Sequence, residues 1–249
     1  MKVGVEHGVH EAILKRDTSV SSGHLIMPHM IDLWLVRHGE TDWNRELRFQ
    51  GHLDAPLNAL GQQQAHRLGQ HLATQGPRPL LASDLLRTRQ TAEPLAGQWQ
   101  TPALPESLWR EQAFGVIEGL TLQEVHERHP EIVKGWRSHD PDFAPEGGES
   151  RRQFHARVMQ AVQSLVERCL NERLESPLVV SHGGVLDMVY RSATGQPLTG
   201  PRECLIPNAG LNHVRTDGVR FEIVQWALTD HLAGLPPSAV YPTALPSKG

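Results

Sequence analysis

Short apolar runs alternate along the chain with longer segments whose apolar residues recur at helical spacing. The first run, Ile31 to Val36, has the length and composition of a strand that is buried on both faces. It stops abruptly at Arg37-His38-Gly39, where a polar loop begins. The other predicted strands are 79–82, 103–109 and 177–180, together with a hairpin of 211–215 and 219–225 that turns at Asp217-Gly218.

Helices are predicted between these strands. Asn58 is a candidate N-cap for a helix that stops at Gly76-Pro77. Ser83 is a candidate cap for the next helix, whose length Pro94 leaves open. The remaining predicted helices are a short one that begins at the capping box Thr121–Glu124, a long one over 149–172 with the apolar stripe Phe154, Val158, Val162, Leu165 and Cys169, and one over 183–194.

This alternation of strands and helices predicts an α/β protein, a three-layer α/β/α sandwich with a mostly parallel central sheet. Residues 30–235 are predicted to form a single domain, because the sequence contains no internal repeat and no second core. Residues 1–29 are interpreted as a polar N-terminal extension without the apolar segment of a signal peptide, and 236–249 as a Pro-rich tail. A cytoplasmic protein without a membrane segment is therefore expected.

The composition excludes several classes of function. The formal net charge of the 249 residues is -4, so no nucleic-acid partner is expected. Two cysteines are too few for a disulfide framework, and Cys169 is predicted to be a buried thiol.

Charged side chains follow several of the predicted strands. Arg37 and His38 end the first strand, Arg87 comes shortly after the second, Glu111 ends the third, and His182 follows 177–180. The carboxyl ends of parallel strands meet at one edge of a sheet, where open α/β sheets bind their ligands. We therefore expect these side chains to converge.

Each of these residues also has a simpler structural interpretation. Arg37 and His38 could be a packing feature, Arg87 could share an exposed helix face with Arg89, and Glu111 could form a surface pair. The joint occurrence at one sheet edge favours a functional site over these alternatives.

Two arginines and two histidines around one point suit the binding of a dianion, because the guanidinium fork matches phosphate oxygens. A neutral histidine could attack phosphorus, and a nearby carboxyl group could protonate the leaving oxygen and later deprotonate water. The chemistry favoured by the residues is therefore phosphoryl transfer.

Four ordered motifs resemble those of a known family. They are Leu35-Val36-Arg37-His38-Gly39-Glu40-Thr41 with Trp43-Asn44, Gln50-Gly51, Asp54 and Pro56-Leu57; Ser83 to Ala92; Arg110-Glu111 with Phe114-Gly115 and Glu118-Gly119; and Val180 to Gly184. The chain resembles the histidine phosphatase superfamily, in its phosphoglycerate mutase-like branch, over about residues 31–226.

The resemblance implies a role for each matching position. His38 would be the phosphorylated nucleophile, with Glu111 as the acid and base. Phosphoryl and substrate groups would be bound by Arg37, Asn44, Gln50, Gly51, Arg87, His182 and Gly183. The resemblance implies no metal and no cofactor. Glu149 lies in a segment that also resembles the family, although capping of the long helix explains it equally well.

Within the family, the sequence favours a phosphatase acting on a small phosphorylated metabolite. The mutases of this family carry a longer segment between the third and last motifs, whereas here only 112–176 separates them. The surroundings of Glu111 also resemble the phosphatases. The alternative is a phosphoglycerate mutase dependent on 2,3-bisphosphoglycerate.

Two other classes of function fit the sequence less well. A non-catalytic module on the same fold would lack one of the charged residues, and all are present. His126 and His129 could place two imidazoles on one helix face, but Pro130 ends that helix and no third ligand is evident. The physiological substrate and the oligomeric state stay open.

Overall fold

The computed structural model describes Met1 and residues 29–238. Most of the predicted extension 1–29 and of the tail 236–249 therefore lies outside the described residues. The division of the chain at residues 30 and 235 stays a prediction.

The described strands form a six-stranded sheet in the order β3-β2-β4-β1-β5-β6. The first four of these strands are parallel to one another; β5 is antiparallel to β1, and β6 is antiparallel to β5. The mostly parallel sheet predicted from the sequence is thus confirmed. The strands are β1 Ile31–Arg37, β2 Leu80–Ala82, β3 Leu104–Pro105, β4 Leu178–Ser181, β5 Leu211–Thr216 and β6 Phe221–Leu228.

Strand β1 lies near the middle of the sheet and is covered on both faces. Leu33 and Leu35 are fully buried in one core cluster, whereas Val36 belongs to the cluster on the opposite face. Side chains of a strand point alternately to its two faces, so a strand with helices on both sides needs apolar residues at nearly every position. This explains the continuous apolar run.

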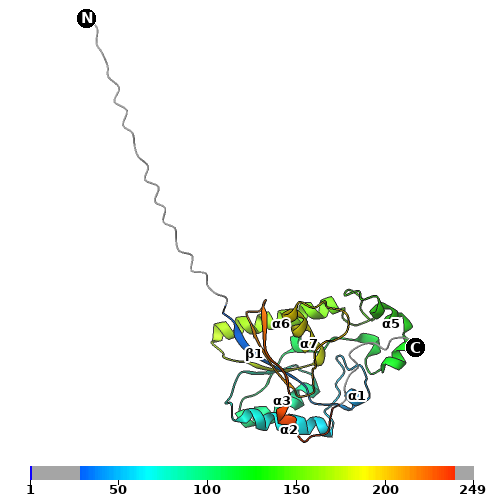
Figure 1. Ribbon diagram of the computed structural model, residues 1–249, viewed down its shortest axis with the longest axis horizontal. Helices are drawn as coiled ribbons and strands as arrows, with labels where there is room; N and C mark the ends of the chain where they lie inside the picture. Colours follow the sequence, from blue (N-terminus) through cyan, green and yellow to red (C-terminus); the bar gives the residue numbers. More distant parts are fainter. Residues whose placement is uncertain (2–28, 239–249) are drawn as a thin grey trace.

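Helices cover both faces of the sheet, which confirms the three layers (Figure 1). The helices α2 Ala59–Ala73 and α3 Leu86–Trp99 pack on one face, and α6 Arg151–Glu172 and α7 Gly183–Thr194 on the other. Asn58 caps α2 as predicted, accepting a hydrogen bond from the Gly61 N–H at 2.8 Å. The long helix is capped by Ser150.

Between β3 and α6 the chain forms a smaller body beside the sheet, in which α4 Leu122–Arg128 and α5 Pro130–Arg137 lie (Figure 1). Its own small core contains Ile117, Val125, Ile132 and Val133. The predicted capping box at Thr121 is present in α4. The helix α5, which begins at Pro130, was not predicted, although proline is well tolerated in the first turn of a helix. The remaining short elements are α1 Asp42–Arg45 and three single-turn helices, η1 Ser107–Trp109, η2 Gly115–Ile117 and η3 Asp230–Leu232.

The predicted strand 103–109 is wrong in its extent. Only Leu104 and Pro105 pair with β2, both exposed at the sheet edge, and the chain then turns into η1. Pro105, which has no N–H, is tolerated in this edge strand, and the Glu106 N–H that follows it donates to the Ala82 carbonyl of β2 at 2.8 Å. Glu111 therefore sits in a loop and not at a strand end.

One expectation for α3 is corrected, and the length that Pro94 left open is now defined. Ser83 is not its N-cap; Leu85 occupies that position, and Asp54 accepts from the N–H of Leu86, the first residue of the helix, at 2.8 Å. Pro94 does not shorten the helix, which continues to Trp99 because Leu95 behind it is buried in the core.

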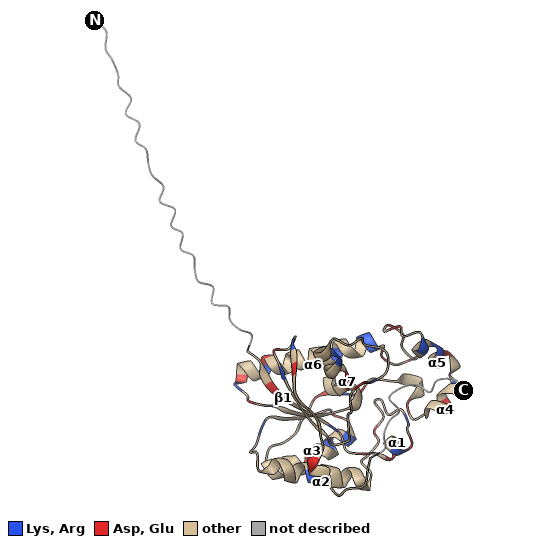
Figure 2. Cartoon of the chain, in the orientation of Figure 1, with Lys and Arg blue, Asp and Glu red and all other residues tan. Residues whose placement is uncertain are grey.

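Acidic and basic residues occur together on the same elements and do not segregate onto separate ones (Figure 2). Within residues 29–238, no helix combines the length and the apolar character that a bilayer crossing requires.

Candidate active site

His38 and His182 directly follow two neighbouring parallel strands. Arg37, the last residue of β1, is in register with Ser181, the last residue of β4. The His38 N–H extends the ladder by donating to the Ser181 carbonyl at 2.9 Å. The two imidazole rings consequently lie 5.3 Å apart between their centroids, at the sheet edge where convergence was predicted.

The protonation of His38 is determined by its surroundings. Its Nδ1 lies 2.7 Å from the Gly39 carbonyl oxygen, which can only accept, so Nδ1 carries the proton. Burial, followed by the positive charges of Arg87 and Arg37, holds the pKa of His38 well below its usual value. The ring is therefore neutral near pH 7, and its Nε2 presents a lone pair.

His182 is fixed by a serine from another strand. Its Nε2 lies 2.8 Å from the Ser83 hydroxyl, which follows β2, and both side chains are fully buried. Burial and the charge of Arg87 lower the pKa of His182 well below its usual value as well. The Nδ1 of His182 is buried and has no hydrogen-bond partner within residues 29–238. A buried polar nitrogen of this kind is suited to a ligand oxygen.

Arg37 and Arg87 bring two guanidinium groups to this point. The Nη1 of Arg37 donates to the Ile206 carbonyl at 2.7 Å. Arg87, in the first turn of α3 and fully buried, donates to the carbonyls of Leu53 and Gly51 at 2.9 and 2.8 Å. These contacts orient both forks through the loops that surround the histidines.

Glu111 reaches the same place from the loop after η1. Its Oε2 accepts from the Gly184 N–H at 3.0 Å, and its Oε1 accepts from the Gln112 N–H at 2.9 Å. A side chain on Gly184 would collide with Oε1 of Glu111, so glycine is required for this approach. The predicted acid thus contacts the N-terminus of α7 at Gly184, which comes two residues after His182.

Asn44, one of the predicted substrate-binding residues, is linked to His38 through another asparagine. Asn44 is buried, and its Oδ1 accepts from the Thr41 N–H at 3.0 Å in the capping box of α1. The same oxygen accepts from Asn208 at 3.3 Å, and Asn208 also donates to the His38 carbonyl at 2.9 Å. Asn208, which the sequence reasoning missed, therefore joins Asn44 to the nucleophile candidate.

Gly51 bonds Arg87, and Gly183 lies close to Arg37. The carbonyl of Gly51 accepts from Arg87, and a Cβ placed on Gly183 would lie 3.4 Å from Nε of Arg37. Gln50 is buried, but its Oε1 has no hydrogen-bond partner within residues 29–238. The amide precedes Gly51, whose carbonyl accepts from Arg87.

Arg157 on α6, which was not predicted from the sequence, holds the loop that carries Glu111. It forms an ion pair with Glu149 at 2.6 Å and donates to the carbonyls of Leu108, Arg110 and Glu111 at 2.8–2.9 Å. Glu149 therefore does not cap the long helix, as had been one interpretation; it anchors Arg157 and accepts from the Ala113 N–H at 2.9 Å. The available signal was an arginine next to the apolar stripe of 149–172.

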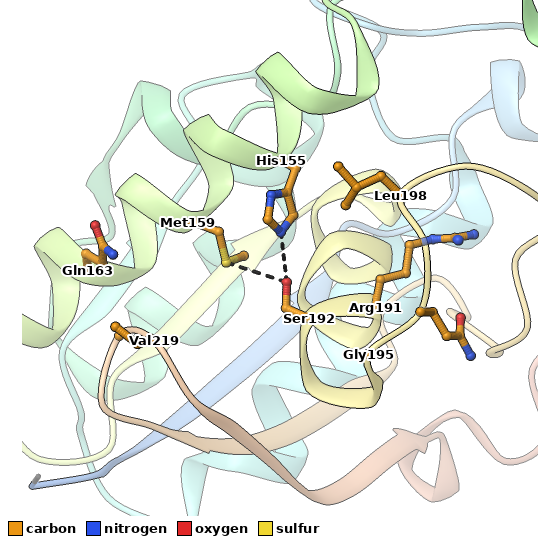
Figure 3. A pocket seen from close by; sticks show the side chains of 10 residues that line it. His155, Met159, Gln163, Arg191, Ser192, Gly195, Leu198 and Val219 are labelled. Carbon is orange, nitrogen blue, oxygen red and sulfur yellow. Dashed lines mark hydrogen bonds between the residues drawn. The ribbon is translucent and has the colours of Figure 1, made fainter. Parts of the chain in front are cut away.

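A separate pocket of about 450 Å³ lies against α6 and α7, and none of the predicted site residues lines it (Figure 3). It contains a histidine and a serine, His155 and Ser192, 2.9 Å apart. The Ser192 hydroxyl donates to the Met188 carbonyl at 2.9 Å, so it accepts from His155 and its proton is not directed at that ring. This pair is therefore not an activated nucleophile.

Other chemistries find no matching cluster in the described part of the chain. No three His, Cys, Asp or Glu side chains there are grouped to hold a metal ion. Cys169 and Cys204 are buried, as predicted for Cys169, and burial raises the pKa of both thiols, that of Cys204 to about 11. They are inert at neutral pH.

The chain has relatives in several organisms. The family model described as "Histidine phosphatase superfamily (branch 1)" matches residues 33–229. A probable phosphoglycerate mutase, GpmB, of Klebsiella pneumoniae is 34% identical over 189 residues, which cover 74% of this chain and 85% of the relative. Phosphoglycerate mutase-like protein 4 of Arabidopsis thaliana is 35% identical over 205 residues, 81% of this chain and 86% of the relative.

Solved structures agree with this relationship. YhfR of Bacillus stearothermophilus superposes with a TM-score of 0.72 at 31% identity, covering 81% of this chain and 99% of that one. A mycobacterial glucosyl-3-phosphoglycerate phosphatase superposes with a TM-score of 0.70 at 27% identity, covering 81% of this chain and 100% of that one. The fold, the ordered motifs and these matches together place the chain in the histidine phosphatase superfamily, branch 1.

Proposed function

We propose that this protein is a phosphatase that hydrolyses a small phosphorylated metabolite through a phosphohistidine on His38. One observation carries the proposal: the Nδ1 proton of His38 is held by the Gly39 carbonyl, which leaves a lone pair on Nε2 beside two arginines. A buried neutral imidazole next to cationic groups is both a nucleophile and part of a site for a dianion.

The reaction proceeds in two steps. In the first, Nε2 of His38 attacks phosphorus, the ester P–O bond breaks, and Glu111 gives a proton to the departing oxygen. In the second, water attacks the phosphohistidine, Glu111 accepts the proton of that water, and the P–N bond breaks to release phosphate. Arg37, Arg87 and His182 stabilise the charge on the transferring phosphoryl group in both steps.

Two observations support phosphatase over mutase activity. The body between β3 and α6 is small, with α4 and α5 of 7 and 8 residues, as expected for a site that lets water in after the first step. Solved phosphatases are also among the similar structures. The alternative, a phosphoglycerate mutase, is suggested by relatives such as the probable phosphoglycerate mutase of Klebsiella pneumoniae.

The proposal is tested by trapping the intermediate. Rapid quenching with a labelled phosphomonoester should give an acid-labile, base-stable label on the wild-type protein and none on His38→Ala. An acid-stable label, or a label retained in His38→Ala, overturns the assignment. With 3-phosphoglycerate and 2,3-bisphosphoglycerate supplied together, release of phosphate should exceed formation of 2-phosphoglycerate, and the opposite result identifies a mutase.

A further inference from the structure

A second group of charges lies behind the start of α7, around Asp187. The Asp187 side chain is 2% exposed, and three arginines surround it. Arg191 lies 3.1 Å from its carboxylate, Arg151 lies 3.3 Å away and Arg202 3.6 Å away. One carboxylate is thus faced by three guanidinium groups, which leaves two positive charges in excess.

Arg191 has a structural role that explains its presence. It is 2% exposed and donates to the carbonyls of Pro197, Thr199, Gly200 and Pro201 at 2.5–3.3 Å. Figure 3 shows its guanidinium directed away from the His155–Ser192 pair. Arg191 alone neutralises Asp187 and fastens the loop after α7, so the other two arginines need a different explanation.

Arg202 lies beside the phosphoryl-binding arginine. The position that a Cβ on Gly183 would take is 3.4 Å from Nε of Arg37 and 3.7 Å from Nη1 of Arg202. The two guanidinium groups therefore flank the same helix start. The Nε of Arg202 is buried and has no hydrogen-bond partner within residues 29–238, and its contact with Asp187 is longer than a hydrogen bond.

Arg151 lies on the other side of the cluster, toward the candidate acid. Its Nη1 is 3.4 Å from the Gln112 amide oxygen, and Gln112 directly follows Glu111. Burial, together with the charges of Arg191 and Arg202, lowers the pKa of Arg151, although Asp187 and Glu111 act in the opposite direction. The excess positive charge thus extends from Arg37 to Glu111 along the start of α7.

We infer that Arg202 and Arg151 bind a second anionic group of the substrate, a carboxylate or a second phosphate, while the phosphoryl group lies on Arg37 and Arg87. This inference rests on the proposed phosphatase function and narrows its substrate class. The favoured substrate is a short phosphomonoester whose leaving group carries a negative charge, because Arg202 and Arg37 approach one point within 4 Å. The second charge takes no part in the chemistry and contributes binding and orientation.

Matched substrates test the inference directly. The pairs are 3-phosphoglycerate with glycerol 3-phosphate, and propane-1,3-diol bisphosphate with propyl phosphate; each differs by one anionic group, a carboxylate or a phosphate. Wild-type kcat/KM should be higher for the doubly anionic member of at least one pair. Arg202→Gln should lower kcat/KM for that member about 10- to 100-fold, mainly through KM, and change the other member less than about threefold, as expected for a lost charge-assisted contact.

Three further variants separate binding from structure. Arg151→Gln should repeat the effect on the same substrate, and Arg202→Lys should restore part of the preference. Arg152→Gln is the matched control, since Arg152 is adjacent in sequence but pairs with the exposed Asp142 at 2.7 Å; it should leave the preference unchanged. Equal loss on both members of a pair in Arg202→Gln overturns the inference.

Binding without turnover separates this inference from the proposed function. The non-hydrolysable 3-phosphonopropionate should bind the wild-type protein at least about tenfold more tightly than propylphosphonate, and Arg202→Gln should remove most of that difference. Equal affinity of the two phosphonates in the wild-type protein contradicts the second site even where phosphatase activity is present. Absence of a label on His38 would contradict the phosphatase while leaving the binding difference measurable.

Discussion

Arg157 on α6 donates to the carbonyl oxygen of Glu111 at 2.9 Å, and so links the long helix to the loop that carries the candidate acid. The same guanidinium is held by Glu149 at 2.6 Å. Because Glu111 is not part of a strand, its position depends on this contact and on the N–H of Gly184. The loop is therefore positioned from outside, by α6 and α7.

Replacement of Arg157 should consequently impair catalysis without removing a group that contacts the substrate. Arg157→Gln is expected to lower the phosphorylation rate about 10- to 100-fold, because a displacement of about 1 Å can cost that much. Breaking a largely buried ion pair should also lower the free energy of unfolding by about 2–4 kcal/mol. Stopped-flow phosphorylation and urea unfolding measure the two effects.

A matched control is available on the same helix. Arg168 makes two ion pairs at 3.6 Å, and Arg168→Gln should change stability by less than about 1 kcal/mol and leave the rate unchanged. If Arg157→Gln phosphorylates His38 at the wild-type rate, the loop does not depend on Arg157.

Ser83 should matter for the orientation of His182. Ser83→Ala removes the hydroxyl 2.8 Å from the buried Nε2, and an unsatisfied buried group costs about 1–3 kcal/mol. Phosphorylation should also slow by about tenfold or more, because the ring is no longer held. The comparison variant is Ser192→Ala, which breaks the similar serine–histidine contact outside the site and should leave the rate intact. Similar rate losses in both variants would show that the Ser83 contact is not special to catalysis.

The lowered pKa of His38 predicts how activity depends on pH. Only neutral His38 has a lone pair to attack phosphorus, and burial with Arg87 and Arg37 keeps it neutral below its usual value of about 6.5. The acidic limb of kcat/KM should therefore not begin near pH 6.5 but at a lower pH. An NMR titration of the free protein checks the assignment, and a His38 midpoint at or above 6.5 would contradict it.

The lowered pKa values of His38 and His182 make the stability of the fold depend on pH. In the unfolded chain His38 and His182 take up protons as the pH falls below about 6.5, whereas the folded protein keeps both neutral. Their contribution is complete above pH 6.5 and is lost as the pH falls toward the lower folded pKa values. Urea unfolding at pH 7.0 and 5.5 should show a smaller pH dependence in His182→Gln than in the wild-type protein; equal dependence would assign the acid sensitivity to other groups.

Glu111 can be tested as the acid through the leaving group. A departing alkoxide needs a proton, and general acid catalysis typically raises the rate of such a step about 10²–10⁴-fold, whereas p-nitrophenolate is stable as an anion. Glu111→Gln should thus slow phosphorylation by an alkyl phosphate far more than by p-nitrophenyl phosphate in single-turnover experiments. Equal losses on both substrates would remove Glu111 from this role, and Glu118, which accepts from the Phe114 N–H at 2.9 Å, would be tested next.

The sequence by itself determined the central strands of the sheet and the two histidines that follow them. Short continuous apolar runs that end at turn residues indicate strands covered on both faces, and residues that follow parallel strands emerge at one edge of the sheet, so the positions of Arg37, His38 and His182 could be predicted from the sequence. The hairpin of β5 and β6 and the cap at Asn58 are equally local and were predicted for the same reason.

Tertiary structure alone decided which side chains support these groups. The Ser83 hydroxyl meets His182 at 2.8 Å, because strand register determines which side chains meet across the sheet, and its contact with the Leu85 N–H at the start of α3 is longer, 3.4 Å. Arg157 bonds the Glu111 carbonyl, and Arg202 comes near the start of α7 beside Gly183, through the packing of helices and loops distant in sequence, for which no period or motif exists. Local patterns specify elements and their ends, whereas contacts between elements arise only when the layers close on one another.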